Sequence, residues 1–311
     1  MAIRPHDRPS VPPLLGIITG IAAVSSASIF IRYAQREAPS LVIAAARLTL
    51  ASLILVPIAL TRYRHEYKRL TRLDGWLAVF SGIFLALHFA TWISSLEYTT
   101  IASSTVLVST CPLFVAVAAW LFLREKIGRA VIVGLVVTLV GSALVGLSDA
   151  GKAGEGMRSA LLGDALALAG AVTVAGYLLI GRRLRAKLSL VPYIAVVYGT
   201  AAVVMLGLVG LAHQTFAGYS PATYGWLLVL ALVPQLIGHS SFNWALAHLP
   251  ATYVSVATLG EPIGSTILAY IILGELPTSI KIMGAVMILV GIVIASQNQS
   301  AKSHKLLDGK G

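Results

Sequence analysis

Ionisable side chains that could contact a charged solute lie inside long apolar stretches of this chain. The stretch VATLGEPIGST, residues 256–266, places Glu261 in an otherwise almost wholly apolar segment. Arg47, His88 and His239 lie in further segments of this kind. Ionisable groups in membrane-spanning segments are costly and usually face the protein interior or a cavity. We therefore expect these side chains to line an interior surface.

Glu261 has three roles open to it. A carboxylate away from water needs a cation, several donors or water, or it takes up a proton. It could bind a substrate ammonium, carry a coupling proton, or accept bonds from backbone donors near a helix break. Pro262 favours a kink, because proline lacks a backbone donor and clashes with the carbonyl one turn upstream. Pro112 predicts a second kink but follows Cys111, so a kink alone does not require an acid.

Polar side chains recur at helical spacing in three apolar segments, so each set shares one helix face. The sets are Ser81, His88, Trp92 and Ser95; Gln235, His239 and Asn243; and Ser255, Thr258, Glu261 and Ser265. We predict a substrate cavity lined by Ser81, His88, Trp92, Gln235, His239, Asn243, Thr258 and Glu261. Structural roles also remain open: serine and threonine bond to nearby backbone, a neutral histidine bridges helices, and tryptophan is common at membrane interfaces.

Arg47 also has three roles open to it. It could snorkel to the membrane surface, pair with an acid such as Glu261 or Asp164, or bind a carboxylate. Each role predicts a different environment for the guanidinium.

The composition places the chain in a membrane. Of 311 residues, 57% are hydrophobic and only 11% are charged, with a mean hydropathy of +0.86. Soluble domains carry about 25% charged residues. A bilayer core needs about 20 mostly apolar residues per helix. Ten such helices are predicted, at 12–33, 39–61, 74–96, 100–123, 129–147, 160–181, 190–212, 224–247, 252–273 and 280–296.

The basic residues predict the orientation. Alternate loops and tails place 17 lysines and arginines on one side of the membrane and five on the other. Basic residues are enriched in cytoplasmic loops, so both termini are predicted to be cytoplasmic. The net charge of +11 is then a consequence of topology, and no nucleic-acid partner is expected.

The sequence repeats at an offset of 150. DGWLAV (74–79) aligns with YGWLLV (224–229), Pro112 with Pro262, and Glu125 with Glu275. Two copies of five spans each must enter the membrane in opposite directions, as inverted repeats of secondary transporters do. The predicted division is a cytoplasmic tail, a first repeat, an extracytoplasmic linker, a second repeat and a cytoplasmic tail, at 1–11, 12–147, 148–159, 160–296 and 297–311.

The repeat also resembles a known family. The segments EYTTIASSTVLVSTCPLFVAVAAWLFLREKIGRAVIVGLVVTLVGSALVGL and LPATYVSVATLGEPIGSTILAYIILGELPTSIKIMGAVMILVGIVIA resemble the EamA repeat of the drug/metabolite transporter superfamily. Within it, the chain is most similar to YddG-type exporters of aromatic and other amino acids. The resemblance implies a ten-helix basket with a central cavity, in the plasma membrane (the bacterial inner membrane). It also implies structural pairing for Arg47, although the second copy, at PYIAVVYG, lacks a cation.

We therefore predict an all-α secondary transporter that exports aromatic and other neutral amino acids by alternating access. Another small metabolite or drug is the alternative cargo, and an intramembrane enzyme is a distant alternative. GHSSF (238–242) departs from the G-x-S-x-G elbow, and neither HExxH nor a Walker A loop occurs. A single cysteine, Cys111, excludes an internal disulfide and a CxxC metal site, and no cofactor is expected. A complete inverted repeat forms its own pathway, so a monomer would suffice.

Overall fold

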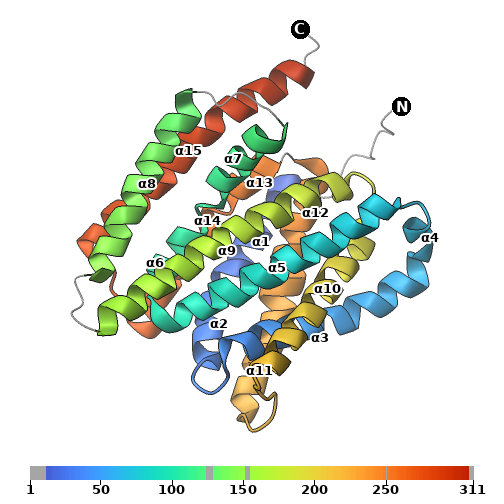
Figure 1. Cartoon of the computed structure of the whole chain (residues 1–311), viewed down its shortest axis with the longest axis horizontal. Coiled ribbons are helices and arrows are strands. Elements are labelled where there is room, and N and C mark those ends of the chain that lie inside the picture. The colour runs from blue at the N-terminus through green and yellow to red at the C-terminus, as the bar shows by residue number, and fades with distance from the viewer. Residues whose placement is uncertain (1–11, 124–128, 151–154, 250, 308–311) are drawn as a thin grey trace.

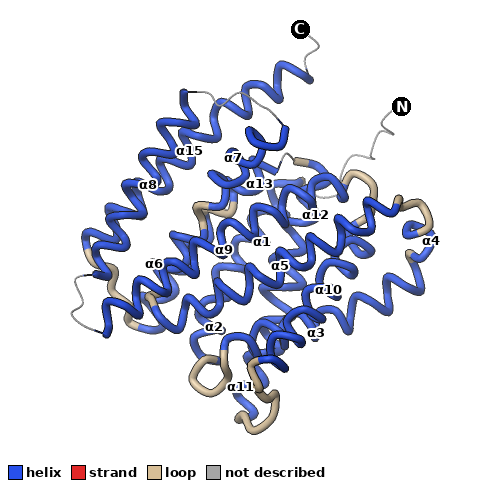
Figure 2. The backbone as a smooth tube through the Cα atoms, viewed as in Figure 1, coloured by secondary structure: helices blue, strands red, loops and turns tan. Residues whose placement is uncertain are grey.

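The computed structural model of the chain describes residues 12–123, 129–150, 155–249 and 251–307 (Figure 1). Within these ranges every regular element is a helix, as the tube in Figure 2 shows. The helices that carry the first repeat are α1 Pro13–Ser25, α2 Ala27–Ala34, α3 Ser40–Arg62, α4 Arg64–Tyr67, α5 Arg72–Tyr98, α6 Ile101–Val108, α7 Cys111–Leu123 and α8 Arg129–Ala150. Those of the second are α9 Glu155–Arg185, α10 Leu190–Leu211, α11 Pro221–Leu230, η1 Ala231–His239, α12 Ser240–His248, α13 Ala251–Ala257, α14 Gly260–Leu268, η2 Ala269–Leu273 and α15 Ser279–Leu307.

Seven helical stretches of the described chain are long and apolar enough to cross a bilayer. They correspond to the predicted spans one to four and six to eight. The fifth, ninth and tenth predicted spans contain shorter apolar helices, at Ile132–Val145, Gly260–Leu273 and Ser279–Gly291. Large apolar side chains also cover the outside, with Leu211 80% and Ile271 70% exposed. Apolar surface of this kind is expected to face lipid rather than water.

The two predicted proline kinks are confirmed and are complete breaks. Helix α6 ends at Val108, four residues before Pro112, and α13 ends at Ala257, one residue before Thr258. Proline clashes with the carbonyl four residues upstream, which here belongs to Val108 for Pro112 and to Thr258 for Pro262. The helix therefore restarts next to each proline, as α7 and as α14.

A π-helix in the eighth span was not predicted. Helix η1, Ala231–His239, contains Pro234 and joins α11 to α12. Pro234 removes one backbone donor from an otherwise regular apolar segment, and π-turns inside α-helices are frequent at functional sites. Gln235 and His239, two of the predicted cavity residues, both lie in this segment.

Close helix contact depends on glycines that recur in both copies. Helices α8 and α15 lie side by side along one edge of the molecule (Figure 1). A Cβ on Gly141 would lie 2.7 Å from the Gly284 carbonyl oxygen, and a Cβ on Gly291 would lie 2.7 Å from that of Gly134. Glycine at these positions lets the two backbones touch.

Candidate functional site

Arg47 has the largest of the fully buried side chains in the described chain. Its side chain is fully buried in α3, and its Cζ lies 4.2 Å from the centroid of the Phe89 ring. None of its three guanidinium nitrogens has a hydrogen-bond partner within the described residues. Buried polar groups are nearly always hydrogen-bonded, so these donors are available to a ligand.

The environment of Arg47 bears on its three predicted roles. A side chain with no exposed surface does not snorkel. Among the described residues it forms no salt bridge within 4.0 Å with Glu261 or with Asp164, whose Oδ1 accepts from the Thr99 hydroxyl at 3.0 Å. A direct ion pair is therefore not formed, but Glu261 lies within electrostatic range of the guanidinium, so pairing at longer range and carboxylate binding both stay open.

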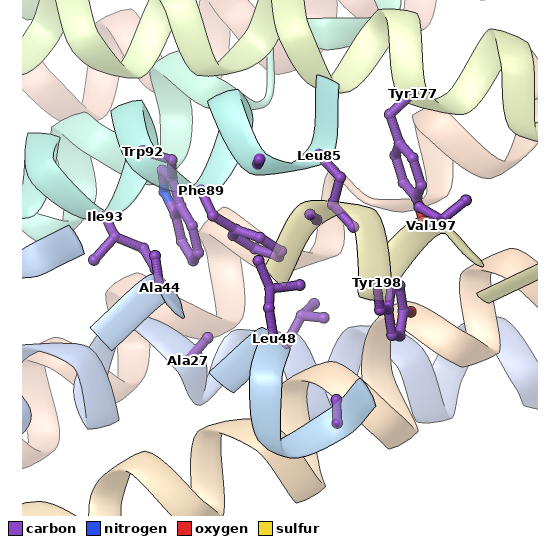
Figure 3. Close-up of a cluster of buried hydrophobic side chains, with 14 of the residues drawn as sticks. Ala27, Ala44, Leu48, Leu85, Phe89, Trp92, Ile93, Tyr177, Val197 and Tyr198 are labelled. Carbon is purple, nitrogen blue, oxygen red and sulfur yellow. The ribbon is translucent and has the colours of Figure 1, made fainter. Parts of the chain in front are cut away.

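Aromatic rings form a wall beside Arg47. Phe89 packs edge-on against His239, with ring centroids 5.1 Å apart, and His88 stacks on Trp92 at 5.8 Å. Figure 3 shows Phe89 and Trp92 extending from α5 and Tyr198 lying nearby on α10. Such a wall offers ring faces to an apolar or aromatic group of a ligand.

Glu261 lies within electrostatic range of the guanidinium. It is half-buried in the first turn of α14, where the positive end of a helix dipole favours a carboxylate. Its backbone N–H donates to the Thr258 carbonyl at 2.9 Å. In the described chain its carboxylate accepts no backbone bond, so binding an ammonium and carrying a proton stay open.

Polar residues of α9, α10 and α12 form a network that sequence reasoning had missed in part. Tyr177 donates to Asn243 Oδ1 at 2.8 Å, and Asn243 Nδ2 donates to the Tyr198 hydroxyl at 3.2 Å and to the His239 carbonyl at 2.9 Å. Asn243 thereby fixes the hydroxyl of Tyr198, and this hydroxyl lies within electrostatic range of Arg47. The signal was present, because Tyr198 lies in PYIAVVYG, the stretch noted only for lacking a cation.

The remaining predicted residues divide into bonded and unbonded groups. Ser81 bonds to the Tyr193 hydroxyl at 3.1 Å, His88 Nδ1 to the Gly170 carbonyl at 3.0 Å, and Thr258 donates to the Ser255 carbonyl at 2.7 Å. These contacts fit the structural roles left open above. By contrast, the buried side-chain amide of Gln235 and the Nε1 of Trp92 have no hydrogen-bond partner in the described part of the chain. Together with Arg47, they supply unsatisfied polar atoms at the aromatic wall.

Away from this wall, Glu275 acts as an ion-pair partner and helix cap, as a repeated acid at a span end predicts. It pairs with Arg32 at 3.3 Å and accepts from the Ile101 N–H at 3.1 Å. Arg32 also donates to the carbonyls of Leu96 and Thr99. The repeat counterpart, Glu125, lies outside the described residues. Among those residues no group of three or more His, Cys, Asp or Glu could hold a metal ion.

A buried polar centre in an all-helical, lipid-facing scaffold is typical of a membrane transporter. The chain belongs to the EamA-like transporter family, whose profile matches residues 12–147 and again 161–297. It therefore contains two copies of one transporter domain, and this family membership indicates a transporter rather than an enzyme.

Related proteins agree with this class. The chain is 26% identical over 261 residues to an uncharacterized transporter of Clostridium kluyveri, covering 82% of this chain and 83% of that one. It is 23% identical over 285 residues to the uncharacterized transporter YetK of Bacillus subtilis, covering 90% and 85%. A crystal structure with 18% sequence identity has the same fold, with a TM-score of 0.63 over 91% of this chain and 96% of the other.

Proposed function

We propose that this transporter exports neutral and aromatic amino acids across the plasma membrane. The observation that carries this is the buried Arg47, whose guanidinium lacks a hydrogen-bond partner among the described residues, contacts the Phe89 ring and lies within electrostatic range of Glu261. A cation and an acid that both lie in a buried region beside aromatic rings complement the two charges of a zwitterion. Neither a simple amine nor a simple carboxylic acid would satisfy both groups.

Each part of an amino acid has a partner in this arrangement. The planar guanidinium binds a carboxylate through two parallel hydrogen bonds, so Arg47 takes the α-carboxylate. Glu261 takes the α-ammonium. The side chain then packs on Phe89, Trp92 and His239, which favours aromatic substrates over small polar ones.

Transport by this site requires access from alternate sides, which an inverted repeat provides. We infer that the two copies form ten crossing helices related by a two-fold axis in the membrane plane, with both termini cytoplasmic. Repeat-equivalent residues that touch one another support this axis, since only residues near a two-fold axis meet their own equivalents. Phe89 and His239, 150 positions apart, are such a pair. The contacts of Gly134 with Gly291 and of Gly141 with Gly284 also fit this axis. Gly284 is equivalent to Gly134 and Gly291 to Gly141, so a two-fold axis exchanges the two contacts.

Radiolabelled uptake into liposomes that contain the purified protein tests the cargo. We expect phenylalanine to be taken up, phenethylamine (no carboxylate) and phenylpropionate (no ammonium) to be excluded, and Arg47→Gln to reduce phenylalanine transport by about 100-fold. Glu261→Gln should reduce it similarly while leaving insertion and folding intact. Uptake of no amino acid would contradict the proposal and move the cargo to another metabolite or drug.

Arg36→Gln is the matched control. Arg36 is exposed, yet its Cζ also lies over an aromatic ring, 4.8 Å from the Tyr33 centroid. Its loss should leave uptake unchanged, because the Arg36 side chain is exposed, whereas that of Arg47 is fully buried. Repeating the assay with an imposed pH gradient separates two mechanisms: downhill uptake without the gradient indicates a facilitator, whereas concentration only with the gradient makes Glu261 the proton carrier.

A further inference from the structure

Two adjoining pockets lie between α6, α14 and α15, on the side of α14 that carries Pro262. The larger, of about 220 Å³, is apolar and is walled by Val106, Ile263, Ile267, Ile282 and Val286 among others. The smaller, of about 150 Å³, is lined by polar groups of Thr100, Glu275, Thr278 and Lys281. Both are lined by Ala102, Thr266, Pro277 and Lys281. They therefore form one double pocket with an apolar part and a polar part.

The apolar part opens on the surface that faces lipid. Ile263 and Ile267 of α14 and Ile282 and Val286 of α15 line it, and each is more than half exposed on the molecule. These helices lie in apolar stretches of the chain. The molecules that reach this opening are therefore those of the bilayer.

The polar part contains one lysine. Lys281 is 7% exposed, lies where the two pockets join, and donates from Nζ to the Thr100 hydroxyl at 3.0 Å. Helices α6 and α15 both begin here, after Thr100 and Thr278, so their positive dipole ends meet at this place. The one carboxylate lining the described pocket, that of Glu275, is engaged by Arg32 and by the Ile101 N–H.

We propose that this double pocket binds an anionic phospholipid, with its phosphate at Lys281 and one acyl chain along the apolar part. Phosphate is favoured by a lysine and by helix N-termini, while the apolar walls match a hydrocarbon chain. The site is separate from Arg47 and does not depend on the cargo. An occupant would contact α14 at Pro262 and Ile263, next to Glu261 in the sequence.

The repeat shows that the lysine is not a requirement of the scaffold. Ile282 and Ile132 are 150 positions apart, and both are 52% exposed. The residue before Ile132 is Val131, whereas the residue before Ile282 is Lys281. The same position in the first copy therefore has no cation, and Ile132 offers a lipid-facing control without the proposed site.

Tryptophan reporters at these two positions test the proposal in liposomes of full-length protein. Ile282→Trp and Ile132→Trp are each compared with the parent protein, and the added emission is quenched with brominated phosphatidylglycerol or brominated phosphatidylcholine. At position 282 we expect about a fivefold preference for the anionic lipid, as for one basic residue at a membrane surface. At position 132 we expect none. Equal quenching by the two lipids at 282, or the same preference at both positions, would overturn the proposal.

A second measurement isolates Lys281. Native mass spectrometry of the purified protein with equal amounts of the two lipids should show one retained phosphatidylglycerol, which Lys281→Gln loses and Arg36→Gln keeps. Retention by Lys281→Gln would remove the lysine from the site. Quenching by a brominated fatty acid but not by brominated phosphatidylglycerol would identify a free amphipathic anion instead and would overturn the phospholipid assignment.

Discussion

Two arginines at equivalent positions of the repeat form equivalent bonds. Arg32 donates to the Leu96 carbonyl, and Arg182, 150 positions later, donates to the carbonyl of Leu246, which is 150 positions after Leu96. One turn further on, the same relation holds again. Gln35 Nε2 donates to the Ile93 carbonyl at 2.9 Å, and Arg185 Nε to the Asn243 carbonyl at 2.9 Å. The helix ends of the two copies are thus fastened by equivalent bonds.

The centre of the molecule has no such equivalence. The counterparts of Arg47 and Glu261 are Val197 and Cys111, and the counterpart of Tyr198 is Leu48. Contacts that hold helices together were kept in both copies, whereas residues proposed to bind the solute occur once. The difference indicates that the repeat supplies a symmetric scaffold, while the proposed binding residues are asymmetric. A single zwitterion has one positive and one negative end, so its binding site needs one cation and one acid rather than two equal halves.

The largest effect should come from breaking the shared scaffold. Gly141→Leu would drive a side chain into the Gly284 carbonyl and into Ile288, 2.7 and 2.9 Å from the added Cβ. We expect loss of folded protein, beyond the usual 1–3 kcal/mol of overpacking, measured as monodisperse yield and thermal midpoint in detergent. Gly207→Leu is the control, because a Cβ there meets nothing within 4 Å. A normal midpoint for Gly141→Leu would show that α8 and α15 need not touch.

Breaking the asymmetric centre should affect transport rather than folding. Arg47→Met removes the unbonded guanidinium and keeps an unbranched apolar side chain over Phe89. Because no described bond is lost, the thermal midpoint should stay the same or rise, while amino-acid transport falls by about 100-fold. A large fall in the midpoint would instead assign Arg47 a structural role.

Substitutions of Arg32 and Arg182, which bond the helix ends together, should have effects of intermediate size on stability. Arg182→Gln and Arg32→Gln each remove a charge-assisted bond to a carbonyl, and each should lower stability by about 1 kcal/mol. Arg32→Gln should cost more, because Arg32 also pairs with Glu275. Thermal or denaturant unfolding of both variants measures this, and unequal effects in the opposite order would break the proposed equivalence.

The smallest effect concerns Glu37, which lies in the turn between α2 and α3. Bonds from the Ser220 N–H and the hydroxyls of Thr223 and Ser220 hold the pKa of Glu37 below its usual value of 4.5. A lowered pKa in the folded state gives stability that is present above the unfolded pKa and is lost as pH falls through the folded value. Glu37→Gln should therefore lower the thermal midpoint slightly at pH 7 and flatten its decline below about pH 4.5. An unchanged pH profile would show that these bonds contribute nothing.

Periodicity alone anticipated much of the helical arrangement. Apolar length predicted the seven helical stretches that are long enough to cross a bilayer, the two prolines predicted kinks at the starts of α7 and α14, and the offset of 150 relates the glycines at which α8 and α15 meet. These features are local, or depend on comparing the chain with itself, so no knowledge of the packing was needed. Cys111 is buried, as an isolated cysteine amid apolar residues suggests.

What the tertiary structure decided is which polar groups meet. Helical spacing predicts that Ser81 and His88 share one face of α5. In the folded chain, however, Ser81 forms a hydrogen bond with Tyr193, and Phe89, the residue after His88, contacts Arg47. The sequence also could not show that the guanidinium of Arg47 would have no partner in the described chain, since that depends on distances between α3, α5, α10 and α14. Spacing along one helix determines a face. Only the packing of four helices determines which side chains that face contacts. A difference of a few ångströms in the distance between two side chains decides whether a buried charge is paired or unsatisfied.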